Sequence, residues 1–391
     1  MTTLERGERL ELFAAAAALG PIVAAHRDAL DQERRTPLPL VEAWRAAGFV
    51  RLWLPVELGG TEADPETVLG VVEAVAALDG AVAWNLLISI SGALFAGYLP
   101  EATAHTIWGA NPDCISAGSF MPTGRAVPVD DGYRVAGRWS FVSGVQHADW
   151  VAGNCLVFDG TQPRMGSDGA PEMRLMFLPA AVGTVLDTWQ TGGLRGTGSH
   201  DLAIADAFVP EGFWFDVFTG RGRIPRPLYR LPFVTWFGPA LAMLTLGIAR
   251  HAIETLVDLA ASKVPTGQQT SLRERPLAQI QVAQAEALVG AARAFLLQTA
   301  GEAWDRLVAG GEPTAGELAR LRLANVHAAE SAVRAVEVMY QAAGTSAIPS
   351  SSALDRCLRD VHVAAQHIAV STQHYQVIGQ TFLNRSGAPA V

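Results

Sequence analysis

The 391-residue sequence has few cysteines and few charged residues. Its three cysteines, Cys114, Cys155 and Cys357, are far apart and form no Cys-x-x-Cys pair, which argues against a disulfide framework or a structural zinc site. Charged residues make up 17% of the chain, against about 25% in an average soluble domain. This low fraction indicates a large buried core and extensive subunit interfaces. The net charge of −9 comes without a basic block, so the sequence does not predict nucleic-acid binding.

The sequence also predicts neither a secretion signal nor a clean apolar span. The apolar stretch 12–25 follows Glu5, Glu8 and Glu11, whereas a signal peptide begins with basic residues. The most apolar segments, near 81–99 and 233–249, are interrupted by polar residues, glycine or proline. Neither provides about 20 consecutive apolar residues. We therefore expect a cytoplasmic protein that does not cross a membrane.

The hydrophobic pattern changes twice along the chain. Helical periodicity covers 1–110, in stretches at 10–34, 38–47, 65–79, 81–98 and 101–109. Short apolar runs with turn residues follow, and predict strands at Tyr133–Val135, Trp139–Val142, Trp150–Phe158, Arg174–Leu178 and Leu202–Val209, with a surface loop at 160–172. Helical periodicity then returns in four long segments, with breaks at 264–267, 310–313 and 344–352. The sequence predicts a mainly α protein with a central β domain: helical domain 1–110, β domain 111–228 and four-helix bundle 229–391.

One glycine-rich run could contact a phosphate group. Gly193-Leu-Arg-Gly196-Thr-Gly198 has the composition of a phosphate loop, but such a loop connects a strand to a helix. Here the strand-like segment 202–208 follows, so a dinucleotide or nucleotide site is not expected. Two interpretations remain: a tight turn, or a loop that brings backbone groups close to a ligand.

The histidines do not have the spacing of a metal site. Asp360, His367 and His374 are seven residues apart and should share one helix face, whereas His362 points elsewhere. No histidine pair has the i, i+4 spacing that would bind a metal from one face of this helix. His367 is either an ordinary buried histidine or a functional one, and Arg359 with Asp360 forms either an intrahelical pair or a buried charge pair.

Three segments, taken in order, resemble the acyl-CoA dehydrogenase superfamily. They are Gly137–Gly144 with His147–Trp150, Gly193–Ser199 with Val209-Pro210, and Arg356-x-x-Arg359-Asp360 after Gly344–Ser346. The resemblance covers essentially the whole chain. It implies an N-terminal helical domain, a middle β-barrel-like domain and a C-terminal four-helix bundle that assembles a homotetramer as a dimer of dimers.

The sequence departs from the dehydrogenases at the catalytic base. Where many of them have a glutamate after the final Arg-Asp, this chain has His367. That feature resembles the branch of two-component (group D) flavin-dependent monooxygenases. The resemblance implies reduced flavin (FADH2 or FMNH2) from a separate NAD(P)H-dependent flavin reductase. It also implies O2 and a C4a-hydroperoxyflavin that oxygenates an aromatic or heteroaromatic small molecule.

The resemblance also assigns roles to individual residues. Ser143 is expected at flavin N5, with the strand-edge hydroxyl bonded only to backbone as the alternative, and Phe141 against the flavin ring. His367 is expected to hydrogen-bond the peroxide or to deprotonate the substrate. The remaining expected cofactor-binding residues are Gly144, Arg195, Ser199, Lys263 and Arg359.

The substrate side lacks a second histidine that several members of the branch carry. Trp84, Asn85 and Ser91 are expected to line the substrate pocket instead, which slightly favours an indole-like substrate over a phenol. One alternative is an FAD-dependent acyl-CoA dehydrogenase whose base is relocated to Glu254 or Glu286. Others are an amine or aminosugar N-oxygenase, and a protein that binds without catalysis.

Overall fold

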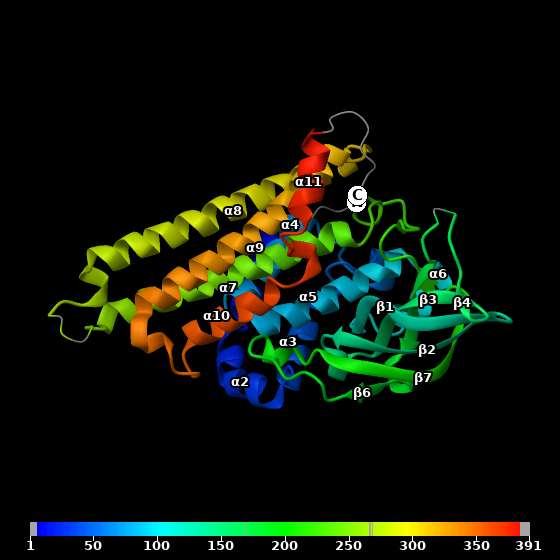
Figure 1. The fold of residues 1–391 in the computed structure, drawn as a ribbon, viewed down its shortest axis with the longest axis horizontal. Helices are drawn as coiled ribbons and strands as arrows, with labels where there is room; N and C mark the ends of the chain where they lie inside the picture. Colours follow the sequence, from blue (N-terminus) through cyan, green and yellow to red (C-terminus); the bar gives the residue numbers. More distant parts are fainter. Residues whose placement is uncertain (1–5, 168, 266, 268, 384–391) are drawn as a thin grey trace.

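The computed structural model describes residues 6–167, 169–265, 267 and 269–383. It is mainly helical, with a sheet at one side, long helices at the other, and helix α5 between them (Figure 1). The N-terminal helices are α1 (Arg6–Ala17), α2 (Gly20–Glu33), α3 (Leu38–Ala46), α4 (Pro65–Ala76), α5 (Gly80–Leu94) and α6 (Glu101–Ala104).

Helix α5 is the buried centre of the molecule. Asp79 caps its N-terminus by accepting hydrogen bonds from the backbone N–H groups of Ala81 (2.9 Å) and Val82 (3.1 Å). Small and aliphatic residues then let both the sheet and the long helices pack against it. This helix therefore brings its side chains between the two halves of the fold.

A single sheet forms the β region. Its strands are β1 (Ser116–Val129), β2 (Gly132–Val142), β3 (Trp150–Asp159), β4 (Gln162–Pro163), β5 (Met173–Pro179), β6 (Thr184–Leu186), β7 (His200–Pro210) and β8 (Trp214–Phe215), in the order β6-β7-β2-β1-β3-β5-β8 with β4 beside β3. The five expected strands all lie within β2, β3, β5 and β7, because the first two are one continuous strand. Strand β1 was not predicted. Part of the expected loop 160–172 is also paired, as β4 and a bridge between Met165 and Pro171, while residue 168 lies outside the described residues.

Trp139 fills the space between these strands. An added Cβ on Gly124 would lie 2.2 Å from the Trp139 ring, and one on Gly153 would lie 2.6 Å from it. The indole Nε1 donates a 2.7 Å hydrogen bond to the carbonyl oxygen of Asn154. The two glycines therefore make room for a buried indole that fixes β2 against β1 and β3.

The second helical region contains α7 (Val234–Ser262), α8 (Pro276–Val308), α9 (Ala315–Ala343), α10 (Ala353–Ala364) and α11 (His374–Leu383). The breaks fall at the expected positions; Thr266, inside the first break, lies outside the described residues. Thr314 and Glu317 form a capping box that starts α9.

The expected common helix face of Asp360, His367 and His374 is wrong. Helix α10 ends at Ala364, and His367 is extended, with φ −67° and ψ 137°. His374 begins the separate helix α11. A spacing of seven residues has no common face once the helix is interrupted.

Among the described residues, three helices are long and apolar enough to cross a membrane by length and composition, and the bent pair α1–α2 passes the same test when joined. This differs from the expectation drawn from the interrupted apolar runs. The apolar windows of α5 and α7 are 89% and 72% buried inside the protein, whereas that of α8 is only 22% buried. The fold itself accounts for the apolarity of α5 and α7, but not for that of α8.

Candidate functional site

Ser143 lies directly after β2, at the point where the strand turns. Its backbone N–H donates to the carbonyl oxygen of Phe141 (3.0 Å), and the N–H of Gly144 donates to the carbonyl oxygen of Thr197 (3.0 Å). Phe141 has a positive φ of 62°, which is unusual for a residue other than glycine, and its side chain is 66% exposed. Ser143 itself is buried. The turn thus places an exposed aromatic ring beside a buried hydroxyl group.

The Ser143 hydroxyl belongs to a connected chain of hydrogen bonds. Trp84 Nε1 donates to Ser143 Oγ (2.9 Å), and Ser143 Oγ lies 2.7 Å from Ser199 Oγ. Ser199 Oγ lies 2.7 Å from Thr197 Oγ1, which donates to the carbonyl oxygen of Leu194 (2.8 Å). We call Ser143, Ser199 and Thr197 the hydroxyl chain. It joins α5, the end of β2 and the glycine-rich loop.

The glycine-rich loop is a tight turn held by α10. Leu194 (φ 49°) and Gly198 (φ 54°) both adopt the left-handed conformation, and β7 follows. The turn interpretation is confirmed, whereas proximity to a ligand stays a prediction. Asp360 Oδ1 accepts a 2.6 Å hydrogen bond from the N–H of Leu194. An added Cβ on Gly193 would lie 2.2 Å from the carbonyl oxygen of Arg359, so only glycine fits against the helix here.

Asp360 is buried in a charged cluster. Arg356 forms ion pairs with Asp31 (3.0 Å) and Asp79 (3.4 Å). Burial, followed by the nearby Asp79, raises the pKa of Asp360. Arg359 instead donates to Asp355 (2.8 Å) within α10 and to the carbonyl oxygen of Gly192. Arg359 and Asp360 are therefore not paired with each other but fix the loop from two sides.

The predicted cationic cofactor contacts are engaged within the chain. Arg195 donates to the carbonyl oxygens of Asp31 (3.0 Å) and Thr191 (2.9 Å). Lys263 lies directly after the C-terminal end of α7. It donates to the carbonyl oxygen of Ala343, the last residue of α9. At 1.5 Å per residue, roughly 40 Å of helix separates Lys263 from Phe237 at the start of α7. Within one chain the structure does not bring Lys263 to Ser143, and the cofactor roles of Lys263, Arg195 and Arg359 stay predictions.

His367 contacts the same tryptophan that binds Ser143. Its ring centroid lies 5.9 Å from Trp84 in an edge-to-face arrangement and 5.4 Å from Phe237. Burial lowers the pKa of His367 to about 4, so the ring is neutral at pH 7. Nδ1 accepts a 3.1 Å hydrogen bond from the backbone N–H of Ala369. In a neutral imidazole whose Nδ1 is the acceptor, Nε2 carries the proton, and His367 presents a hydrogen-bond donor.

The remaining expected residues of α5, Asn85 and Ser91, differ in their contacts. Asn85 Nδ2 donates to Thr36 Oγ1 (2.9 Å) and to the carbonyl oxygen of Thr197 (3.0 Å), so Asn85 supports the loop. Asn85 Oδ1 is buried without a hydrogen-bond partner, as is the hydroxyl group of Ser91. Ser91 follows Trp84 by seven residues and shares its face of the helix. Its substrate role stays a prediction.

Several aromatic residues of this region were not singled out from the sequence. From His367, ring contacts continue through Phe237 to Phe120 (6.4 Å) and on to Phe95 (6.2 Å). Phe95 shares the α5 face of Trp84 and Ser91. These rings come from the turn directly after α5, from β1 and from α7, elements far apart in sequence. Thr197 was also missed, although it lies inside the motif from which Arg195 and Ser199 were chosen.

The residues around Ser143 fit a flavin ring. A bound planar ring needs apolar cover and a few polar groups at its edge. Phe141 offers an uncovered aromatic side chain, Ser143 a hydroxyl group, and Asn85 an unpaired buried oxygen that would lie 3.5 Å from a Cβ added to Gly144. The site thus combines an apolar surface with a buried hydroxyl group and one buried oxygen atom that lacks a partner.

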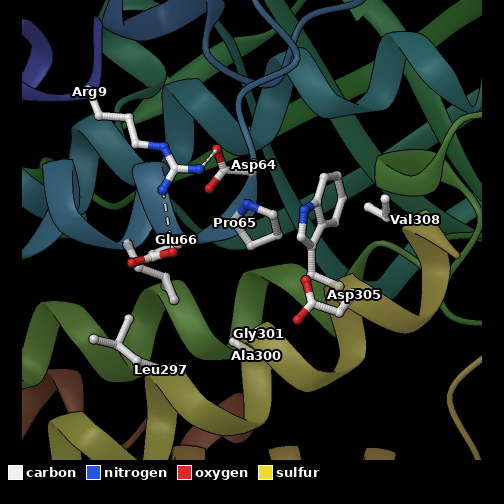
Figure 2. A pocket seen from close by; sticks show the side chains of 11 residues that line it. Arg9, Asp64, Pro65, Glu66, Leu297, Ala300, Gly301, Asp305 and Val308 are labelled. Atoms are coloured by element: carbon white, nitrogen blue, oxygen red, sulfur yellow. Dashed lines mark hydrogen bonds and ion pairs between the residues drawn. The ribbon is translucent and has the colours of Figure 1, made fainter. Parts of the chain in front are cut away.

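A hollow of about 250 Å³ lies elsewhere, between the start of α4 and the C-terminal half of α8 (Figure 2). Arg9 crosses it to Asp64 (3.0 Å) and Glu66 (3.4 Å), with Asp305 and Val308 on the α8 side. It contains none of the expected site residues.

The two carboxylates considered as relocated bases lie on exposed helix surfaces. Glu286 of α8 forms a two-bond ion pair with Arg250 of α7 (2.7 and 2.9 Å). Glu254 is exposed, and partial desolvation together with Asp258 raises its pKa while Arg250 opposes the shift. Neither has a described contact with Trp84, Ser143 or His367.

Comparison with known proteins identifies the family of this chain. Residues 240–372 match the family model "Acyl-CoA dehydrogenase, C-terminal domain". Indole-3-acetate monooxygenase of Pseudomonas putida is 33% identical over 359 residues, covering 92% of this chain and 90% of that protein. The flavin-dependent monooxygenase oxygenase subunit HsaA of Mycobacterium tuberculosis is 27% identical, covering 97% and 96%.

Comparison with solved structures also finds a relative that binds reduced flavin. XiaF from Streptomyces sp., in complex with FADH2 and glycerol, superposes with a TM-score of 0.89 at 25% identity and covers 98% of both chains. The chain therefore belongs to the acyl-CoA dehydrogenase superfamily, in the branch formed by the oxygenase components of flavin-dependent monooxygenases.

Proposed function

We propose that this chain uses reduced flavin and O2 to insert one oxygen atom into an aromatic or heteroaromatic small molecule, with indole-like substrates slightly favoured over phenols. The observation that carries the proposal is the environment of His367. His367, which the family resemblance aligns with the glutamate base of many dehydrogenases, is a neutral imidazole, and it contacts the tryptophan that binds Ser143.

When bound, the reduced flavin supplies the electrons that activate O2. In this proposal Phe141 and Ser143 would hold the flavin ring, with the Ser143 hydroxyl group at flavin N5. His367 donates a hydrogen bond from Nε2 to an oxygen atom in the site. The aromatic residues around His367 exclude water, which strengthens these hydrogen bonds and limits wasteful release of H2O2.

The protonation state of His367 supports the substrate preference. A phenol gains reactivity when a base removes its proton, but the Nδ1 acceptor of His367 is already occupied by the N–H of Ala369. An indole ring is electron-rich without losing a proton. The aromatic lining formed by Trp84, Phe120 and Phe237 suits such a ring, and a P. putida relative is named for indole-3-acetate.

Assembly and flavin supply complete the proposal. We propose FADH2 or FMNH2 delivered by a separate NAD(P)H-dependent reductase, and a homotetramer built through the C-terminal helices. The exposed apolar side of α8 supports the tetramer, because a second copy of the helix layer would cover it. The division at about residues 110 and 228, with a four-helix bundle at the C-terminus, belongs to the same proposal.

The first test is stopped-flow absorbance after mixing the protein and photoreduced FAD or FMN with oxygenated buffer. We expect a transient spectrum, distinct from oxidised flavin, that persists longer than for free flavin and shortens in Ser143→Ala. Immediate return to oxidised flavin, together with bleaching of bound FAD by an acyl-CoA, would instead favour the dehydrogenase.

A substrate screen with a flavin reductase then tests the preference. Indole, indole-3-acetate, simple phenols and amines are compared by product formed per flavin oxidised. Oxidation of phenols with no reaction of any indole would overturn the indole preference, and N-oxygenation of amines alone would make the chain an N-oxygenase.

A further inference from the structure

The hydroxyl chain has a direction that follows from its two ends. At one end, Trp84 Nε1 can only donate, so Ser143 Oγ must accept its hydrogen bond. At the other end, the carbonyl oxygen of Leu194 can only accept, so Thr197 must donate to it. With its single proton committed to Leu194, Thr197 accepts from Ser199, and Ser199 in turn accepts from Ser143. Every proton in the chain points from Ser143 towards Leu194.

The Leu194 end keeps the chain in this direction. Thr197 Oγ1 lies 2.8 Å from the Leu194 carbonyl oxygen, and two oxygen atoms at this distance repel each other unless a proton lies between them. All three hydroxyl groups are buried, so no bulk water replaces a partner that is lost. The Leu194 carbonyl oxygen also accepts from Trp189 Nε1 and from the N–H of Thr197 (both 3.1 Å), so reversal would not leave it unpaired. Reversal would instead place two oxygen atoms 2.8 Å apart with no proton between them.

Ser143 is consequently left with one free lone pair and no free proton. A hydroxyl group has one donor and two acceptor positions. Its proton goes to Ser199, and one lone pair accepts the Trp84 N–H. Towards a ligand in the site, Ser143 can act only as an acceptor.

We propose that Thr197 and Ser199 are positioning residues that hold Ser143 as a hydrogen-bond acceptor and thereby make this protein bind reduced flavin in preference to oxidised flavin. Reduced flavin carries a hydrogen on N5, which Ser143 can accept. Oxidised flavin has only a lone pair on N5, which would face the lone pair of Ser143. The inference rests on the proposed contact between Ser143 and flavin N5.

The test compares dissociation constants of oxidised flavin, in air, and reduced flavin, under anaerobic conditions, for the full-length protein. We expect the wild type to bind reduced flavin about tenfold more tightly, the difference that one well-formed hydrogen bond produces. Tenfold preference for the two-electron reduced form raises the midpoint potential of the bound flavin by about 30 mV, which provides an independent readout.

Four variants separate proton direction from simple loss of a contact. Thr197→Val removes the link to Leu194, so Ser199 can donate to Ser143 and Ser143 can donate to the ligand; the preference should fall about tenfold. Ser199→Ala should do the same, because it removes the acceptor of the Ser143 proton. Thr197→Ser keeps the hydroxyl and should retain the preference. Trp84→Phe removes a hydrogen bond to the same oxygen without freeing its proton, so both affinities should change together.

The outcomes distinguish this inference from the proposed function. An unchanged affinity ratio in folded Thr197→Val and Ser199→Ala, with a normal oxygen transient in the wild type, would overturn the positioning role alone. The same loss of ratio in Thr197→Ser as in Thr197→Val would attribute the effect to packing and overturn it as well. Wild-type protein that binds neither flavin form would overturn both proposals.

Discussion

At the residue scale, His367 combines a low pKa with a fixed tautomer. Its pKa of about 4 means that the donor at Nε2 and the acceptor at Nδ1 persist far below the ordinary histidine pKa of about 6.5. We expect the yield of oxygenated product per flavin oxidised to stay level from about pH 8 to about pH 5 and to fall as the pH approaches 4. The measurement is product against H2O2 across this range.

The matched variant is His367→Gln, which should give a lower yield at every pH without the fall near pH 4. A wild-type inflection near pH 6.5 that disappears in the variant would contradict the buried, neutral histidine.

The lowered pKa of His367 also affects the stability of the protein. The folded state binds fewer protons than the unfolded chain between about pH 4 and 6.5, so the contribution of His367 to the free energy of unfolding decreases as pH falls through that window.

At the scale of elements, Asp360 couples α10 to the loop that carries the hydroxyl chain. Asp360→Ala leaves the buried N–H of Leu194 without an acceptor, which should cost about 1–3 kcal/mol in the free energy of unfolding. The loosened loop should also weaken flavin binding. Asp360→Asn keeps an oxygen acceptor and removes a charge that burial disfavours, so we expect a smaller loss. Urea unfolding and flavin titration of both variants test this, and equal losses would mean that charge, not the Leu194 contact, matters.

Element by element, periodicity located most helices and four of the long strands, but it failed at two places that form the site. Strand β1 begins Ser116-Ala-Gly-Ser-Phe-Met-Pro, a sequence without apolar alternation. A bulge between Ser119 and Gly124 also interrupts its pairing with β3. The end of α10 lies in a segment, 364–370, that contains neither glycine nor proline. At the break His367 caps the short turn 368–370 and its ring contacts Trp84 and Phe237, two residues far away in the sequence.

The site was only partly predictable for the same reason. Ser143, Phe141 and His367 followed from matching motifs to a family. The hydrogen bond between Trp84 and Ser143 joins residues 59 positions apart, and the ring contact between Trp84 and His367 joins residues still farther apart. Such pairings depend on how α5 lies between the sheet and the long helices, and they had to be read from the structure.

At the scale of the whole molecule, α8 is the long helix with the least covered apolar surface. Leu277 is 62% exposed and Ile280 is 54% exposed. If a second copy of the chain covers this surface, Leu277→Glu combined with Ile280→Glu should place charges in the contact and reduce the tetramer to smaller species. Light scattering after size-exclusion chromatography measures the change.

The control for the assembly is a glutamate at Val185, which is 41% exposed on the short strand β6, away from the long helices. It should leave the mass unchanged. A wild-type protein that is monomeric at micromolar concentration would contradict the tetramer and leave the exposed face of α8 to a different partner, such as a membrane surface.

Phe141 has a consequence for the thermodynamics of the empty protein. A phenyl side chain held at φ 62° and 66% exposed combines backbone strain with apolar hydration, and neither favours the folded state. A ligand that covers the ring removes the second of these costs. Calorimetry should therefore record a negative heat-capacity change when flavin binds, and the melting temperature should rise with flavin concentration. In the cell, the proposed flavin reductase would then also influence how much of this protein remains folded.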